Sequence, residues 1–184
     1  RTASVPTMAA LGRCIGAYAR VAPQKLVSAF VDSVLTQLDA SIQASNTQKP
    51  SKKSNKRKQN DEMLDEPSSS ASPNAQLAAK RFFLCGVAAS LVPALSSDSV
   101  KRLYSILEPC LKQTHDRKLQ KVAFRALESL CRDVDGFIAS QWSQSLSKLL
   151  LTSLSSAVPA AKRARLACVQ AALEHLVKRQ RKHQ

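Results

Sequence analysis

Aromatic residues are scarce in this 184-residue chain, and glycine is scarcer still. Only 4% of the residues are aromatic, glycine occurs 4 times, and none of the 5 cysteines belongs to a C-x-x-C pair. The low glycine content argues against phosphate-cradling loops, and the cysteine and histidine spacings argue against a zinc site. No nucleophile elbow or dinucleotide fingerprint occurs either. We therefore expect no enzyme activity, no catalytic residue, no metal site and no cofactor.

Long apolar runs are also missing. The longest nearly uncharged stretch, Phe82–Leu95, is well short of the roughly 20 residues that cross a bilayer, so we expect a buried helix there. Residues 1–20 have no secretory signal pattern. The chain begins at Arg1 instead of a methionine, and we expect a piece of a longer protein. The odd number and wide spacing of the cysteines predict buried free thiols in a reducing compartment.

What the chain does contain is helical periodicity, and we find no convincing strand. Large apolar residues recur at helical spacing, for example from Leu119 to Val134. Asp98 and Asp116 are suitable N-caps, and Pro93 is expected to end or kink its helix. Together these helix-start and helix-end signals predict seven helices, at about 6–20, 23–44, 74–92, 98–112, 116–134, 137–154 and 159–179.

Residues 45–73 differ sharply in composition from the rest. They are polar and Ser-rich, and they lack aromatic residues, so they cannot bury enough surface to offset the entropy of ordering. We expect a flexible insert, with residues 1–44 (a first helix pair) and 75–184 (the remaining helices) packing as one structural unit. The insert carries a basic cluster that we interpret as a nuclear import signal, formed by Lys49, Lys52, Lys53, Lys56, Arg57 and Lys58.

The stretch Asp116–Leu130 has the general form of the second helix of a HEAT repeat. It has a capping aspartate, a basic residue beside a valine, and then a small residue and a leucine; residues 159–176 are a looser version. Such helix pairs stack into solenoids, where each pair needs neighbours to cover its apolar face. The sequence therefore predicts an all-α, HEAT/armadillo-like α-solenoid segment, with neighbouring repeats of the parent chain among its partners.

Positive charge is concentrated in the helical part. The formal net charge is +15, and residues 75–184 carry +11 of it. At ~100° per residue, five cations of the helix predicted at 116–134 lie within one arc of its surface, the basic arc, formed by Arg117, Lys118, Lys121, Arg125 and Arg132. Glu128 is the one acidic residue inside this arc. Like charges kept together favour a polyanionic partner, although an ordinary solvated face stays open. The candidate RNA-binding residues are Lys101, Arg102, Arg117, Lys118, Lys121, Arg125, Arg132, Lys162, Arg163, Arg165, Lys178, Arg179, Arg181 and Lys182.

Two features indicate close packing between helices. Gly12 and Gly16 share one helical face and permit another helix to approach. In the last predicted helix, large apolar residues from Leu166 to Leu176 lie on one side, and small residues, among them Ala164 and Cys168, lie on the opposite side. That second side is either a packing surface for another helix or a solvent-tolerant alanine face.

Residues Val100–Lys112 and Gln120–Cys131 together resemble the ribosomal RNA processing protein 12 family. This resemblance implies a long HEAT-type solenoid of the nucleus and nucleolus, shuttling to the cytoplasm, that assists maturation and export of the small ribosomal subunit. It implies a non-catalytic scaffold that binds pre-ribosomal RNA and ribosome-assembly proteins. No membrane and no small-molecule substrate are implied.

The alternative function is a solenoid of the nuclear transport-receptor or adaptor kind, which binds protein partners. The charge of the helical part favours RNA, because a transport receptor generally needs acidic surfaces for basic cargo.

Overall fold

The structure is a computed structural model that describes residues 5–47, 73–114, 116–141 and 145–181. Within these ranges the chain is all-α, as the sequence predicts, with eight α-helices, one 3₁₀ turn and no strand. The predicted insert and its import signal fall almost wholly on residues 48–72, outside the described residues. The elements are α1 (Val5–Val21), α2 (Gln24–Thr47), α3 (Pro73–Leu91), η1 (Val92–Ala94), α4 (Ser97–Lys112), α5 (Arg117–Asp133), α6 (Phe137–Gln141), α7 (Ser147–Ser156) and α8 (Pro159–Arg181).

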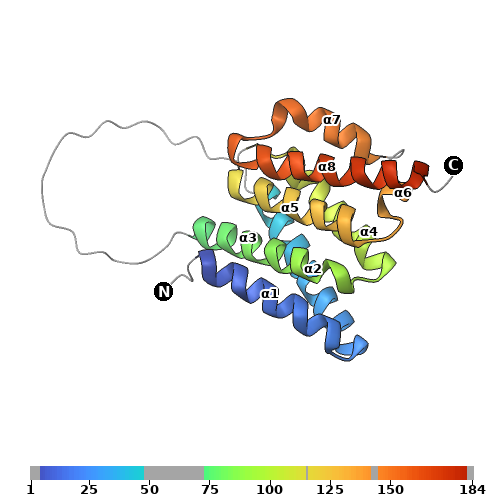
Figure 1. Ribbon diagram of the computed structural model, residues 1–184. Coiled ribbons are helices and arrows are strands. Elements are labelled where there is room, and N and C mark those ends of the chain that lie inside the picture. Colours follow the sequence, from blue (N-terminus) through green and yellow to red (C-terminus); the bar gives the residue numbers. More distant parts are fainter. Residues whose placement is uncertain (1–4, 48–72, 115, 142–144, 182–184) are drawn as a thin grey trace, which may run out of the picture.

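The helices form two rows (Figure 1). One row runs α1, α3, α5 and α8, with each helix packed against the next, and the second row runs α2, α4 and α7. The rows are joined mainly by α2 against α3 and by α4 against α5. Short connections between antiparallel helices produce such layers. The HEAT-type solenoid itself stays a prediction.

Helix α5 lies at the centre of the core, between α3 and α8 and against α4. Its Phe124, Leu127 and Leu130 are fully buried. Its first turn is capped by Asp116, whose carboxylate accepts a hydrogen bond from the Leu119 N–H at 3.0 Å. This hydrogen bond confirms Asp116 as the predicted N-cap. Because α5 packs against α3, α4 and α8, only one side of it reaches solvent.

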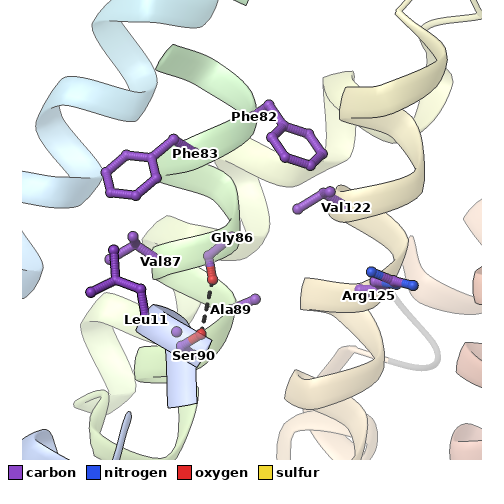
Figure 2. A pocket seen from close by; sticks show the side chains of 10 residues that line it. Leu11, Phe82, Phe83, Gly86, Val87, Ala89, Ser90, Val122 and Arg125 are labelled. Carbon is purple, nitrogen blue, oxygen red and sulfur yellow. Dashed lines mark hydrogen bonds between the residues drawn. The ribbon is translucent and has the colours of Figure 1, made fainter. Parts of the chain in front are cut away.

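Helices α1 and α3 meet through small residues. A Cβ added at Gly12 would lie 2.7 Å from Ser90 Oγ, and one added at Gly16 would lie 2.8 Å from the Ser90 carbonyl oxygen. The Ser90 hydroxyl itself donates to the Gly86 carbonyl at 3.1 Å (Figure 2). The predicted close approach at Gly12 and Gly16 is therefore present, and α3 is the helix that makes it.

Replacing Gly16 with alanine is expected to destabilise the protein by about 1 kcal/mol or more, because the added methyl group meets backbone that cannot rotate away. The matched control is Gly86→Ala, where the new Cβ has nothing within 4 Å and alanine gains up to ~1 kcal/mol of helix propensity. Urea unfolding midpoints of the two variants should move in opposite directions. Equal midpoints would contradict the close packing of α1 on α3.

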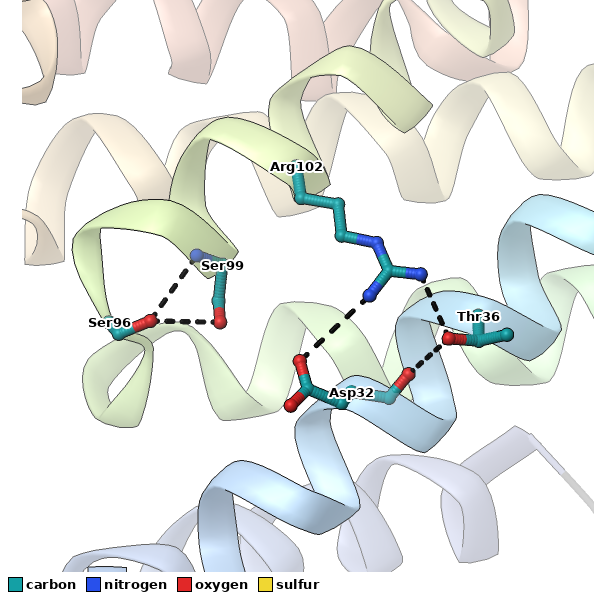
Figure 3. Close-up of polar contacts among 5 residues, drawn as sticks. All are labelled: Asp32, Thr36, Ser96, Ser99 and Arg102. Carbon is teal, nitrogen blue, oxygen red and sulfur yellow. Dashed lines mark hydrogen bonds and ion pairs between the residues drawn. The ribbon is translucent and has the colours of Figure 1, made fainter.

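Two predicted helix boundaries need correction. Helix α4 is capped by Ser96, whose hydroxyl oxygen accepts from the Ser99 N–H at 3.3 Å (Figure 3), so the prediction of Asp98 as N-cap is wrong. Asp98 instead lies in the first turn. The helix predicted at 137–154 is described as two, α6 and α7, and residues 142–144 between them lie outside the described residues. Pro93 falls in the 3₁₀ turn that follows α3, as expected of a helix-ending proline.

Helix α8 packs its small residues against α5, which decides between the two readings of that side. Buried Ala164 and Ala171 belong to the packed face, and the Cys168 sulfur lies 4.0 Å from the sulfur of Cys131 on α5. Ala160 is exposed and Ala167 half-buried, so they lie at the margin of the contact. Small side chains allow the two helices to approach closely, and the packing-surface reading is confirmed.

Four of the five cysteines are buried and all five are free thiols. Cys14 is exposed, which corrects the prediction that all are buried. Burial raises the pKa of the Cys110 thiol to about 12 and raises the pKa of Cys85 as well. Because a thiolate is the reactive form, these buried groups act as small apolar core residues.

One helical stretch among the described residues, Asn74–Ala94, is long and apolar enough to cross a membrane by length and composition. In the structure its Leu84 and Leu91 are buried in the core, and its Arg81 forms an ion pair with Asp116 at 3.8 Å. The stretch has the properties of a core helix.

Candidate nucleic-acid interface

The solvent face of α5 carries the basic arc. The apolar side chains of α5 are buried on one side, and Arg117, Lys118 and Arg125 are exposed on the other, with Lys121 half-buried. None of these four side chains forms a hydrogen bond or ion pair with another described residue. Their charges therefore face solvent or a ligand. They lie on the side of α5 opposite its buried residues, as the helical spacing predicts.

Arg132 differs from the other four cations of this arc. Its guanidinium forms an ion pair with Glu128 at 3.2 Å, one turn earlier on α5. An exposed i,i+4 pair of this kind is worth only ~0.5 kcal/mol, so a phosphate can displace the carboxylate. Arg132 nevertheless starts from a partly neutralised position, and Arg117, Lys118, Lys121 and Arg125 are the stronger candidates.

A small hollow adjoins the basic arc. It has a volume of about 200 Å³ and lies between α1, α3 and α5, with Arg125 and Val122 on the α5 side and Leu11 on the α1 side. Phe82 and Phe83, expected in the core, are only half-buried at its edge. Figure 2 shows that the two rings point to opposite sides of α3. They form no joint platform for stacked bases, so the arrangement favours phosphate contact over base stacking.

The predicted cations of α4 lie in the other row of helices. Arg102 donates from Nη2 to Thr36 Oγ1 at 2.8 Å and forms a longer ion pair with Asp32 at 3.9 Å (Figure 3). Lys101 forms an ion pair with Asp98 at 3.7 Å. Arg102 thus ties α4 to α2, and the structure does not bring these two residues to the basic face of α5.

Arg165 is the clearest correction among the candidate residues. It is buried, and its guanidinium donates from Nε to Ser153 Oγ at 2.9 Å and from Nη2 to the Leu150 carbonyl at 2.6 Å. Arg163 and Arg165 are close in sequence, but ~100° per residue puts them on different sides of α8. Arg165 faces α7 and holds the two helices together, so it is not available to RNA.

The remaining cations of α8 are divided between the two ends of the helix. Lys162 and Arg163 are exposed near its start, and Lys178 and Arg181 are exposed near its end. Lys182 and the side chain of Arg179 lie outside the described residues. The two groups of α8 cations are thus about four helical turns apart, and among the described helices only the α5 arc is a continuous cationic surface.

No group of three or more histidine, cysteine or acidic side chains that could hold a metal ion occurs among the described residues. Comparison with known proteins gives no match to a family model, to a curated protein or to a solved structure.

Proposed function

We propose that this chain is a non-catalytic, RNA-binding segment of a ribosome-assembly factor. The observation that carries the proposal is the solvent face of α5. Four cations lie there (Arg117, Lys118, Lys121 and Arg125), and none of them forms an ion pair with a described carboxylate. Keeping like charges adjacent costs stability unless a polyanion neutralises them. Phosphate contact through such a face gives binding that depends on shape and salt, with little sequence preference.

The cellular setting of the proposal comes from the family resemblance described above. In that setting the segment contributes to maturation and export of the small ribosomal subunit, within the nucleus and nucleolus. It binds pre-ribosomal RNA through α5 and assembly proteins through other helical faces.

Binding to a mixed-sequence single-stranded RNA tests this proposal. Four phosphate contacts predict that affinity falls about 50-fold between 50 and 200 mM salt, since the salt slope for single strands is about −0.7 per contact. Fluorescence anisotropy at several salt concentrations measures the slope. No binding at 50 mM, or an affinity that does not change with salt, would overturn the proposal.

A second candidate function is an adaptor that binds protein partners. It is favoured by an apolar groove of about 470 Å³ between α1 and α2, whose lining includes Tyr18, Leu26 and Phe30; all three side chains are exposed. An adaptor function would give peptide binding that is insensitive to salt, in contrast to the steep salt dependence expected with RNA.

A further inference from the structure

The outer face of α8 exposes large apolar side chains. Leu166, Leu173 and Val177 are 61%, 51% and 47% exposed, although the small residues of the same helix are buried against α5. The three side chains lie within ~40° of one another around the helix, on the side opposite α5. We call these three residues the α8 stripe. Exposed apolar side chains grouped in this way mark an interaction surface more often than isolated ones do.

The size of the α8 stripe matches one helix. From Leu166 to Val177 it extends over 12 residues, a rise of about 16 Å or three helical turns. A shallow hollow lies along it, bordered by Val169 on one side and by Gln170 and Glu174 on the other. Gln170 donates to the Glu174 carboxylate at 2.8 Å, which fixes this polar edge. A partner helix with apolar residues at i, i+3, i+4 and i+7 fits such a surface.

Charge at the two ends of the α8 stripe identifies the partner's chemistry. Lys162 and Arg163 are exposed at its start, and Lys178 and Arg181 at its end. Glu174 is the acidic side chain along it, and its carboxylate already accepts the hydrogen bond from Gln170. Both ends therefore favour negative charge on the partner.

Two other occupants fit less well. A second copy of the chain would bring cations against cations in either orientation of α8, because both ends of the stripe are basic. A membrane surface favours helices with Lys and Arg along the whole polar face, whereas the edge of the α8 stripe carries Gln170 and Glu174 at mid-length.

We infer that the α8 stripe is the docking site for an amphipathic helix of a partner protein, with a three-turn apolar face and acidic side chains at both ends. The site is separate from the α5 face, so it does not depend on the proposed RNA binding.

The probe for this docking site is a designed helical peptide with leucines at i, i+3, i+4 and i+7 and glutamates at both ends. A second peptide with lysines in place of the glutamates should bind at least tenfold more weakly at 50 mM salt. Combining Leu166→Ser with Leu173→Ser should weaken the glutamate peptide about 100-fold, since each buried leucine is worth about a factor of ten. Fluorescence anisotropy measures all three affinities.

The matched control combines Leu151→Ser with Leu154→Ser, which removes two leucines of α7 that are at least as exposed as Leu166 and Leu173. This control should leave the affinity within twofold of wild type. Combining Lys178→Glu with Arg181→Glu should weaken the glutamate peptide and strengthen the lysine peptide, which a folding defect cannot do. Equal binding of the two peptides, or an equal loss in the α7 control, would overturn the inference. Self-association by sedimentation, or binding to anionic phosphatidylserine vesicles, that disappears in the Leu166/Leu173 variant would also overturn it.

Discussion

Replacing Arg117, Lys121 and Arg125 with alanine is expected to lower the affinity for single-stranded RNA about 100-fold at 0.1 M salt. Each phosphate contact contributes about 0.7 of a decade in affinity at that concentration through counterion release. The three side chains lie on the solvent face of α5, and alanine is a strong helix former. The thermal midpoint by circular dichroism should therefore stay within a few degrees of wild type while fluorescence anisotropy reports the loss of binding.

The control removes the same amount of charge from the other row of helices. Lys25, Lys112 and Lys148 are all exposed, on α2, α4 and α7, and their replacement with alanine should change the affinity by less than about threefold. Lys112 pairs with Glu108 at 2.8 Å, and loss of such an exposed ion pair should lower the stability of the control by less than about 1 kcal/mol. If both triple variants lost affinity equally, RNA binding would follow net charge and not the α5 face.

Replacing Gln120 with methionine is expected to destabilise the protein by about 3 kcal/mol. The buried Gln120 amide donates to the carbonyls of Leu111 at 3.1 Å and Ser156 at 3.3 Å, and its carbonyl oxygen accepts from the Val158 N–H at 2.9 Å. One side chain thus satisfies backbone groups at the ends of α4 and α7 and at the start of α8. Methionine keeps a similar volume, so the loss reports unsatisfied buried polar groups and not a cavity.

For a chain of this size, 3 kcal/mol corresponds to a fall in the thermal midpoint of about 10 °C. The matched control is Gln170→Met on the exposed side of α8, which should stay within about 0.5 kcal/mol of wild type. Equal midpoints for the two variants would show that the Gln120 amide does not hold the three helix ends together.

Local patterns predicted the helices well because their causes are local. Asp116 caps α5 through its own side chain, and the apolar spacing from Leu119 to Leu130 determines which side of α5 is buried. The exposed arc of Arg117, Lys121 and Arg125 follows directly from that buried side. The close helix contact at Gly12 and Gly16 was likewise predictable, because two glycines on one helical face leave room for another helix to approach.

Pairings between distant helices were not predictable in the same way. Arg165 is the third of three basic residues in a short run, and only the position of α7 makes it a buried donor to Ser153 and Leu150. Arg102 likewise depends on the position of Thr36 in α2, 66 residues away. Large apolar side chains normally face the core, but α8 places its small residues against α5 and leaves Leu166 exposed. The sequence spacing shows that α8 has a small-residue face and a large apolar face. Only the packing of α5 against α8 shows that the small-residue face is the buried one.

The salt dependence of RNA affinity, compared between wild type and the Arg117/Lys121/Arg125 alanine variant, tests the role of the α5 face most directly. If these three side chains contact phosphates, the slope of log affinity against log salt should be less steep by about 2 in the variant. The Lys25/Lys112/Lys148 variant should keep the wild-type slope. Identical slopes in wild type and the α5 variant would contradict phosphate binding by this face.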